Sequence, residues 1–223
     1  MPNAETLRPG CRPLLAATIA YGVLAASGGV ALAALGTLPA ATETGPELVV
    51  WFRSYPRSIR LGVWAFTVAV PPLAVMVAFL RGMLPSPHRD VFLVGAIVYA
   101  ASIAVWTWTW AGLALHANTL DPAITRTVLD VALFMGPVLT GATTTMMAPV
   151  TLLALRGDSL PRWLGVLGLV AFVEQSIETI TIFGSTGFTQ PGGAMNMQLG
   201  GGLTLAWIFG FGLWGGLRGR YSA

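Results

Sequence analysis

The sequence predicts an all-α membrane protein, a bundle of about six transmembrane helices with both termini in the cytoplasm. Hydrophobic residues make up 55% of the chain and charged residues only 9%, and the mean hydropathy is +0.73. Long apolar runs alternate with short connectors that carry arginine, a pattern typical of polytopic membrane proteins. The 223 residues leave room for little beyond the spans, so we expect one membrane domain and no soluble catalytic domain.

Six candidate spans follow one another along the chain. They lie at about 13–38, 61–80, 91–117, 127–155, 163–183 and 198–217. The first run is longer than the apolar core of a signal peptide, so we interpret it as an uncleaved span. Pro71 and Pro72 in the second span, and Pro137 and Pro149 in the fourth, are expected to kink or locally unwind these helices.

The arginines give the expected orientation. One side of the bilayer would hold Arg8, Arg12, Arg81, Arg89, Arg156, Arg162, Arg218 and Arg220, and the other side Arg53, Arg57, Arg60 and Arg126. The richer side is normally cytoplasmic, which places both termini inside. The complete absence of lysine indicates a GC-rich bacterial genome, so the predicted location is the bacterial cytoplasmic membrane.

The segment "PELVVWFRSYPRSIR", residues 46–60, is the exception to the arginine pattern. Its aromatic residues stand beside its three arginines, and both suit the headgroup layer of a membrane. We interpret the segment as an element that lies on the outer membrane surface. A segment that re-enters the bilayer is the alternative.

Several classes of site are not supported by the sequence. The net charge is +3, but the arginines stand at the ends of apolar runs, so we expect no nucleic-acid partner. The single Cys11 excludes an intramolecular disulfide and a thiol-rich metal site. His88 and His116 are widely separated, and no HExxH, phosphate-loop or GxSxG motif occurs. We therefore predict neither a metal nor a cofactor.

Two acidic residues inside the fifth span are the main functional candidates. Glu174 lies about 17 Å into that span, near the expected bilayer centre, and Glu178 about 6 Å further along. The spacing of four places both on one side of the helix. With Gln175 and the nearby hydroxyl residues they form a polar stripe, which we expect to face the bundle interior.

A glutamate at this depth needs a cationic partner when it is ionised, and no basic residue falls in the middle of a predicted span. Glu174 is therefore protonated, lies in a hydrated cavity, or binds an external cation or amine. A protonated glutamate that only joins neighbouring helices by hydrogen bonds is the structural alternative.

Three further residues are candidates in the same half of the bundle. Asp130 falls in the first turn of the predicted fourth span, where it could cap the helix or serve as a secondary acid. Trp106 and Trp110 share one helix face in "WTWTWAGLALHAN". They would form part of an interfacial aromatic belt or, alternatively, a wall around a cationic ligand.

The carboxyl-terminal third resembles a class of small multi-pass bacterial membrane proteins that are largely uncharacterised. The residues that carry the likeness are "LPRWLGVLGLV" and "GFTQPGGAMNMQLGGGLTLAWIFGFGLW". The resemblance implies a fold of six or seven helices and no particular activity.

Three functions are consistent with these residues. The first is a ligand-handling or transport protein with a protonatable acidic site, and the second is an intramembrane enzyme that uses a glutamate as general acid on a lipophilic substrate. The third is a structural or accessory subunit. The expected partners are the lipid bilayer and a small lipophilic or cationic ligand, and the sequence leaves the oligomeric state open.

Overall fold

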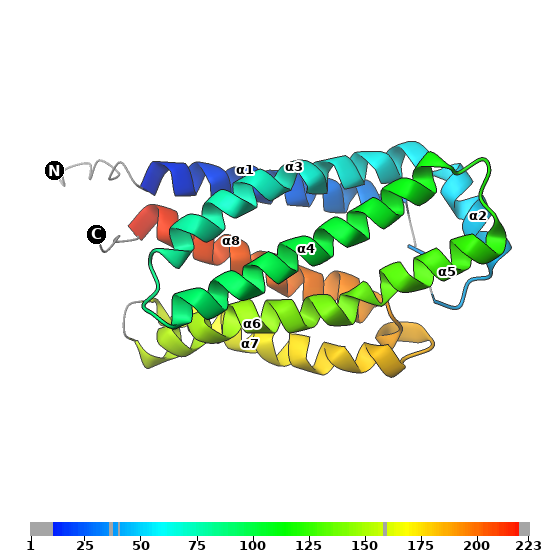
Figure 1. Cartoon of the computed structure of the whole chain (residues 1–223). Helices are drawn as coiled ribbons and strands as arrows, with labels where there is room; N and C mark the ends of the chain where they lie inside the picture. Colours follow the sequence, from blue (N-terminus) through cyan, green and yellow to red (C-terminus); the bar gives the residue numbers. More distant parts are fainter. Residues whose placement is uncertain (1–10, 36–37, 40, 158–159, 219–223) are drawn as a thin grey trace.

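The computed structural model describes residues 11–35, 38–39, 41–157 and 160–218, and it shows a bundle of long helices (Figure 1). The α-helices are α1 (Cys11–Ala33), α2 (Gly45–Ser54), α3 (Pro56–Arg81), α4 (His88–Leu115), α5 (Pro122–Leu133), α6 (Met135–Arg156), α7 (Arg162–Glu178) and α8 (Gly201–Arg218). The shorter elements are the 3-10 helices η1 (Thr179–Phe183) and η2 (Gly187–Thr189) and the π-helix η3 (Met195–Gly200). These residues include no strand.

Six segments of the described chain are long and apolar enough to cross a membrane. They are Arg12–Leu32, Pro56–Arg81, His88–Leu115, Pro122–Arg156, Arg162–Phe183 and Met195–Leu217. The fourth combines α5 with α6, the fifth combines α7 with η1, and the sixth combines η3 with α8. The chain is therefore an all-helical protein with six segments of membrane-spanning length, as its composition predicts.

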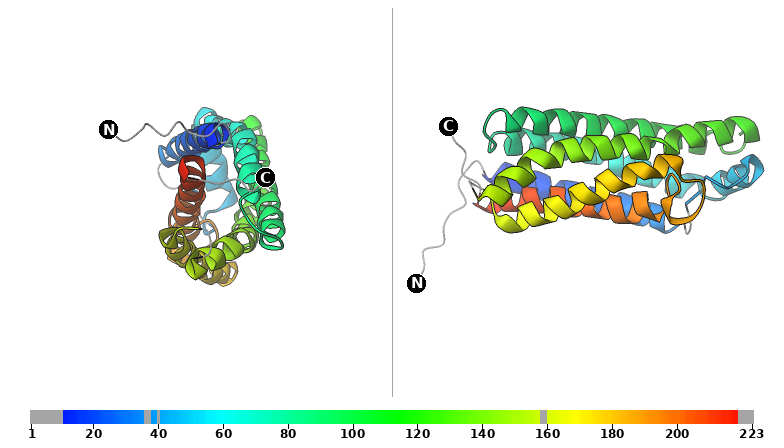
Figure 2. Two further views of the ribbon diagram at one scale, coloured as in Figure 1. Left: turned by 90° about the vertical axis from the view of Figure 1, so that its left-hand side faces the viewer. Right: turned by 90° about the horizontal axis from the view of Figure 1, so that it is seen from below.

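The six segments form a closed ring. Each contacts its neighbours in the sequence, from α1 to α3, α4, α6, α7 and α8, and α8 then contacts α1. The view along the bundle in Figure 2 shows this arrangement. Because the bundle has an even number of segments that alternate in direction, α1 begins and α8 ends at the same end of the bundle (Figure 1).

Small residues let the helices of the ring approach one another closely. Gly212 of α8 lies against Thr18 of α1, and Gly95 of α4 lies against the backbone of Met146 in α6. A side chain at either glycine would collide with these neighbours. Close approach of this kind is how helices associate in lipid, where burial of apolar surface does not drive them together.

Two apolar clusters fill the bundle. The larger one spans most of its length, and its largest fully buried side chains include Phe92, Trp207 and Phe211. The smaller one lies around α2 and α5 and includes Phe52 and Trp110. The helix α2 packs mainly against α5 at the end of the bundle away from the termini (Figure 1).

The helix bounds differ from the predicted spans at several places, of which three affect the interpretation. The predicted fourth span is interrupted at Phe134, because Pro137 has no N–H for the Leu133 carbonyl and its ring clashes with that carbonyl. The second span begins at Pro56, so the end of the segment 46–60 belongs to α3. The first helix ends at Ala33. Residues 36–37 of that predicted span lie outside the described residues, as do Arg8 and Arg220 of the topology count.

Candidate functional site

The polar stripe of α7 forms one side of the candidate site. Gly168, Ala171, Gln175 and Glu178 are buried at helical spacing, so this face of α7 points into the bundle. Gln175 and Glu178 are each only 3% exposed. Glu174 lies at the edge of the same face and is half-buried.

Gln175 joins the two glutamates. Its amide nitrogen Nε2 donates to Glu174 Oε2 at 2.9 Å and to Glu178 Oε2 at 2.6 Å. Its carbonyl oxygen lies 2.5 Å from the hydroxyl of Thr143 in α6, which can donate to it. One side-chain amide thus connects both carboxyl groups to the neighbouring helix α6.

The π-helix η3 supplies the second donor to Glu178. Asn196 Nδ2 donates to Glu178 Oε1, and it also lies 3.4 Å from the hydroxyl oxygen of Thr181. The side-chain oxygen Oδ1 of Asn196 accepts from the backbone N–H of Gly192 at 3.1 Å. Both oxygens of Glu178 are therefore hydrogen-bonded. We call Thr143, Glu174, Gln175, Glu178, Thr181 and Asn196 the acidic network.

Gly200, the last residue of η3, allows η3 to pack directly against Gln175 and Glu178 of α7. A methyl group added at Gly200 would collide with Glu178 Oε2 and Gln175 Nε2. Only a residue without a side chain brings the start of the last span so close to α7. A π-helix inserts an extra residue into the helical hydrogen-bond pattern and often occurs at functional sites.

Glu174 also faces an open groove on the outside of the bundle. The groove has a volume of about 430 Å³ and is otherwise apolar; its lining is Leu169, Val170, Val173, Glu174, Ile177, Met195 and Leu199. Glu174 Oε1 is buried and has no hydrogen-bond partner. In contrast to Glu178, Glu174 thus has one oxygen satisfied and one free beside an apolar surface.

No ion pair involves either glutamate among the residues that the structure describes. The ion pairs found there join Arg81 and Arg89 to Asp90, and Arg126 to Asp130. Among the described residues, the hydrogen bonds to the two carboxylates all come from neutral amide groups. In this part of the chain, no group of three or more histidine, cysteine, aspartate or glutamate residues could hold a metal ion.

No family model, curated protein or solved structure matches this chain. Its function has to be inferred from the site itself.

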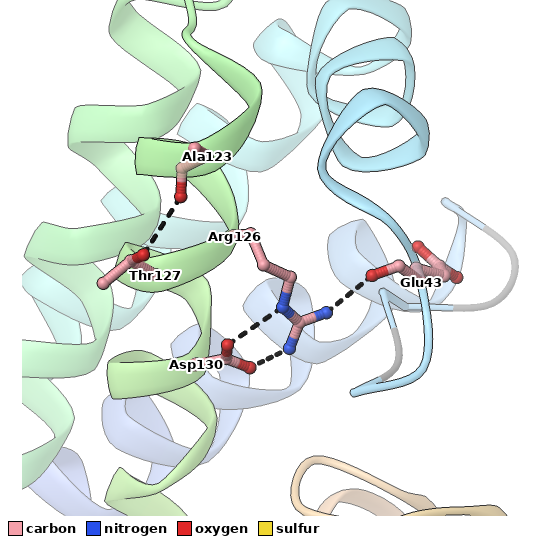
Figure 3. Close-up of polar contacts among 5 residues, drawn as sticks. All are labelled: Glu43, Ala123, Arg126, Thr127 and Asp130. Carbon is pink, nitrogen blue, oxygen red and sulfur yellow. Dashed lines mark hydrogen bonds and ion pairs between the residues drawn. The ribbon is translucent and has the colours of Figure 1, made fainter.

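The structure places Asp130 away from the acidic network, in a second polar cluster shown in Figure 3. Arg126 binds both carboxylate oxygens of Asp130 and donates to the carbonyl oxygen of Glu43 at 2.8 Å. The interpretation of Asp130 as a first-turn residue is wrong. The helix begins at Pro122, and its N-cap is Asp121, which accepts from the backbone N–H of Ile124 at 2.9 Å.

Trp106 and Trp110 also lie apart from the glutamates. Their ring centroids are 5.3 Å apart, and Trp110 packs against Trp51 and Phe52 of α2 at 5.8 Å from each. Trp110 is only 1% exposed. These two rings belong to the smaller apolar cluster, whereas Trp108 is 67% exposed on the outside of the bundle.

Sequence reasoning missed Asn196 and Gly200. Both fall where a flexible loop leads into the last span, and nothing in the sequence pairs them with α7. The signal that could have found Asn196 is a polar amide at the start of an apolar run, directly after a span that carries two glutamates.

Proposed function

We propose that the chain is a multi-pass protein of the bacterial cytoplasmic membrane, with both termini in the cytoplasm, that binds and transports a small lipophilic amine in exchange for a proton. The observation that carries this proposal is the free oxygen of Glu174, buried at an otherwise apolar groove. An acid in such a place suits a ligand that has an apolar body and one positively charged donor.

The groove favours a ligand that arrives from the lipid. Val170, Val173 and Ile177 are among the exposed apolar residues of α7, and in the proposed placement they contact the acyl chains. A lipophilic ligand would therefore reach Glu174 sideways, without crossing the apolar clusters of the bundle. The groove's volume suits a compact apolar body rather than a peptide.

The two states of the site would balance in charge. The proposed exchange begins with one proton on the carboxyl groups of the acidic network and no ligand in the groove. When an ammonium group binds, that proton leaves to water and the ammonium forms a charge-assisted hydrogen bond to the carboxylate. The net charge of the site is the same in both states, because one cation replaces one proton.

Binding of 1-aminoadamantane tests the proposal, with 1-adamantanol as the neutral probe of the same shape. Calorimetry on the purified chain in lipid nanodiscs should show binding of the amine and weaker binding of the alcohol. Measurements in two buffers of different ionisation enthalpy should show release of a proton. Glu174→Gln should weaken amine binding about tenfold to a hundredfold, whereas Glu47→Gln, which removes a carboxylate outside the groove, should leave binding unchanged.

Equal binding of the amine and the alcohol, or unchanged binding by Glu174→Gln, would overturn the proposal. In that case the network only holds helices together, as the accessory-subunit hypothesis requires.

A further inference from the structure

Three polar atoms deeper in the same helix interface have no hydrogen-bond partner among the residues that the structure describes. They are the hydroxyl oxygens of Thr151 in α6 and Thr204 in α8, and the indole nitrogen of Trp207 in α8. The three residues are 6%, 3% and 0% exposed, respectively. A buried polar group without a partner is costly, so such groups in native proteins are normally satisfied by protein atoms or by ordered water.

The two threonines differ from the usual helical threonine, whose hydroxyl donates to a carbonyl of the preceding turn. Thr18, Thr67 and Thr109 all make that bond, at 2.8 to 2.9 Å. The hydroxyls of Thr151 and Thr204 do not. They therefore remain available for a partner in the space between the helices.

These atoms continue the acidic network along the seam between α6, α7 and α8. Thr204 and Trp207 follow Gly200 by four and seven residues, so all three share one face of the last span. Thr151 follows Thr143 by eight residues on α6 and shares its face. At the far level, Thr151 Oγ1 and Trp207 Nε1 both lie against Gly168 of α7, where any side chain would collide with them.

The rise of the last helix sets the distances along the seam. Gly200, which lies against Gln175, is about 6 Å from Thr204 along the helix axis, and Thr204 is about 4.5 Å from Trp207. Polar groups at such distances are too far apart for a direct hydrogen bond and can be joined through one or two water molecules. The path from the Gln175 level to the Trp207 level would be about 10 Å long.

We propose that this seam holds a chain of internal water molecules, bound by Thr151, Thr204 and Trp207, that leads from the acidic network towards the middle of the bundle. A role for these water molecules in carrying the exchanged proton rests on the proposed function, whereas their presence in the seam does not. One turn further along the same faces of α7 and α8, the apolar side chains of Leu164 and Phe211 are fully buried. In this proposal the water chain ends at that level.

Hydrogen exchange of the tryptophan indole groups tests the water chain. The full-length protein, labelled with ¹⁵N at tryptophan and placed in nanodiscs, is transferred to D₂O and followed by NMR. Trp207→Phe and Trp110→Phe assign the two signals. Trp110 is the internal control, because its indole nitrogen is also buried and unpartnered but lies in the smaller apolar cluster, away from the unpartnered hydroxyls of Thr151 and Thr204.

The Trp207 indole should exchange at least about tenfold faster than that of Trp110, a difference equivalent to about one hydrogen bond. Thr204→Val should slow it towards the rate of Trp110 and lower the melting temperature, because a water-bonded hydroxyl is lost. Equal exchange of the two indoles, or a higher melting temperature for Thr204→Val, would show a dry seam and overturn the inference. Amine binding is measured separately, so a dry seam and a failed ligand site give different results.

Discussion

Gly200 lies against the carboxylate of Glu178, and the space between them admits no side chain. Gly200→Ala should therefore separate η3 from α7 and disturb the acidic network. We expect a loss of stability of about 1–3 kcal/mol, the usual cost of overpacking a closely packed interface. Thermal unfolding in detergent measures the loss.

The matched control for this change is Gly202→Ala, two residues further along. Gly202 is exposed, and an added methyl group there meets no other atom. Alanine in a helix is up to about 1 kcal/mol more stable than glycine, so this variant should gain stability. If both variants behaved alike, the close contact at Gly200 would have no energetic importance.

Asn196→Leu should destabilise the bundle although leucine and asparagine are similar in size. The change removes the donor to Glu178 Oε1 and the acceptor for the Gly192 N–H, and each buried group left unsatisfied costs about 1–3 kcal/mol. Gln198→Leu, on the exposed side of the same π-helix, is the control and should change the melting temperature little. A neutral Asn196→Leu would mean that Asn196 does not hold Glu178.

Glu47, outside the six segments, gives a pH dependence with a defined sign. Its carboxylate accepts from the backbone N–H of Thr44 at 2.6 Å and from the Thr44 hydroxyl at 2.8 Å, and these bonds, the first above all, lower the pKa of Glu47. Because the folded pKa lies below the unfolded one, the stabilisation is present above the unfolded value, about 4.3, and is lost as the pH falls through the folded value.

The stability advantage of the parent over Glu47→Gln should therefore shrink as the pH falls below about 4.3. Melting curves over this pH range measure it. Thr44→Val, which removes only the weaker of the two donors, should reduce the pH dependence in part. A pH-independent difference between parent and Glu47→Gln would show that the two hydrogen bonds do not persist in solution.

Labelling from one side of the membrane tests the proposed orientation. In a chain whose Cys11 is replaced, Ser185→Cys should react with an impermeant thiol reagent in intact cells, and Ser86→Cys should react only after lysis. The two positions lie in connectors at opposite ends of the bundle, between α7 and η2 and between α3 and α4. The reverse labelling pattern would move the groove of Glu174 towards the cytoplasm.

The sequence predicts the features of the fold that depend on amino-acid composition and on helical spacing. Apolar runs of sufficient length indicate the six segments, and the spacing of Glu174 and Glu178 indicates a common side of α7. The break at Phe134 follows from Pro137, but proline also occurs inside unbroken helices, as Pro71 and Pro72 of α3 show. The effect of a proline thus depends on how neighbouring helices support it.

Contacts between distant residues are what the sequence does not predict. Asn196 meets Glu178 across a loop of irregular conformation, and no periodic pattern encodes that pairing. Trp110 is buried because α2 folds over it, whereas an aromatic residue near a span end is more often interfacial. The apolar run begins at about residue 127 and so predicts Asp130 in the first turn, whereas the true start signals, Asp121 and Pro122, stand before that run.

The closed ring of helices has a consequence for how the chain is made. During synthesis α1 emerges first and α8 last, so the seam between them forms only after the final helix has been made. Until then Gln175 and Glu178 lack the cover that η3 and α8 give them. Polar groups facing lipid are costly. In the proposed membrane placement, a chain that stops short of α8 would therefore leave these polar groups facing lipid.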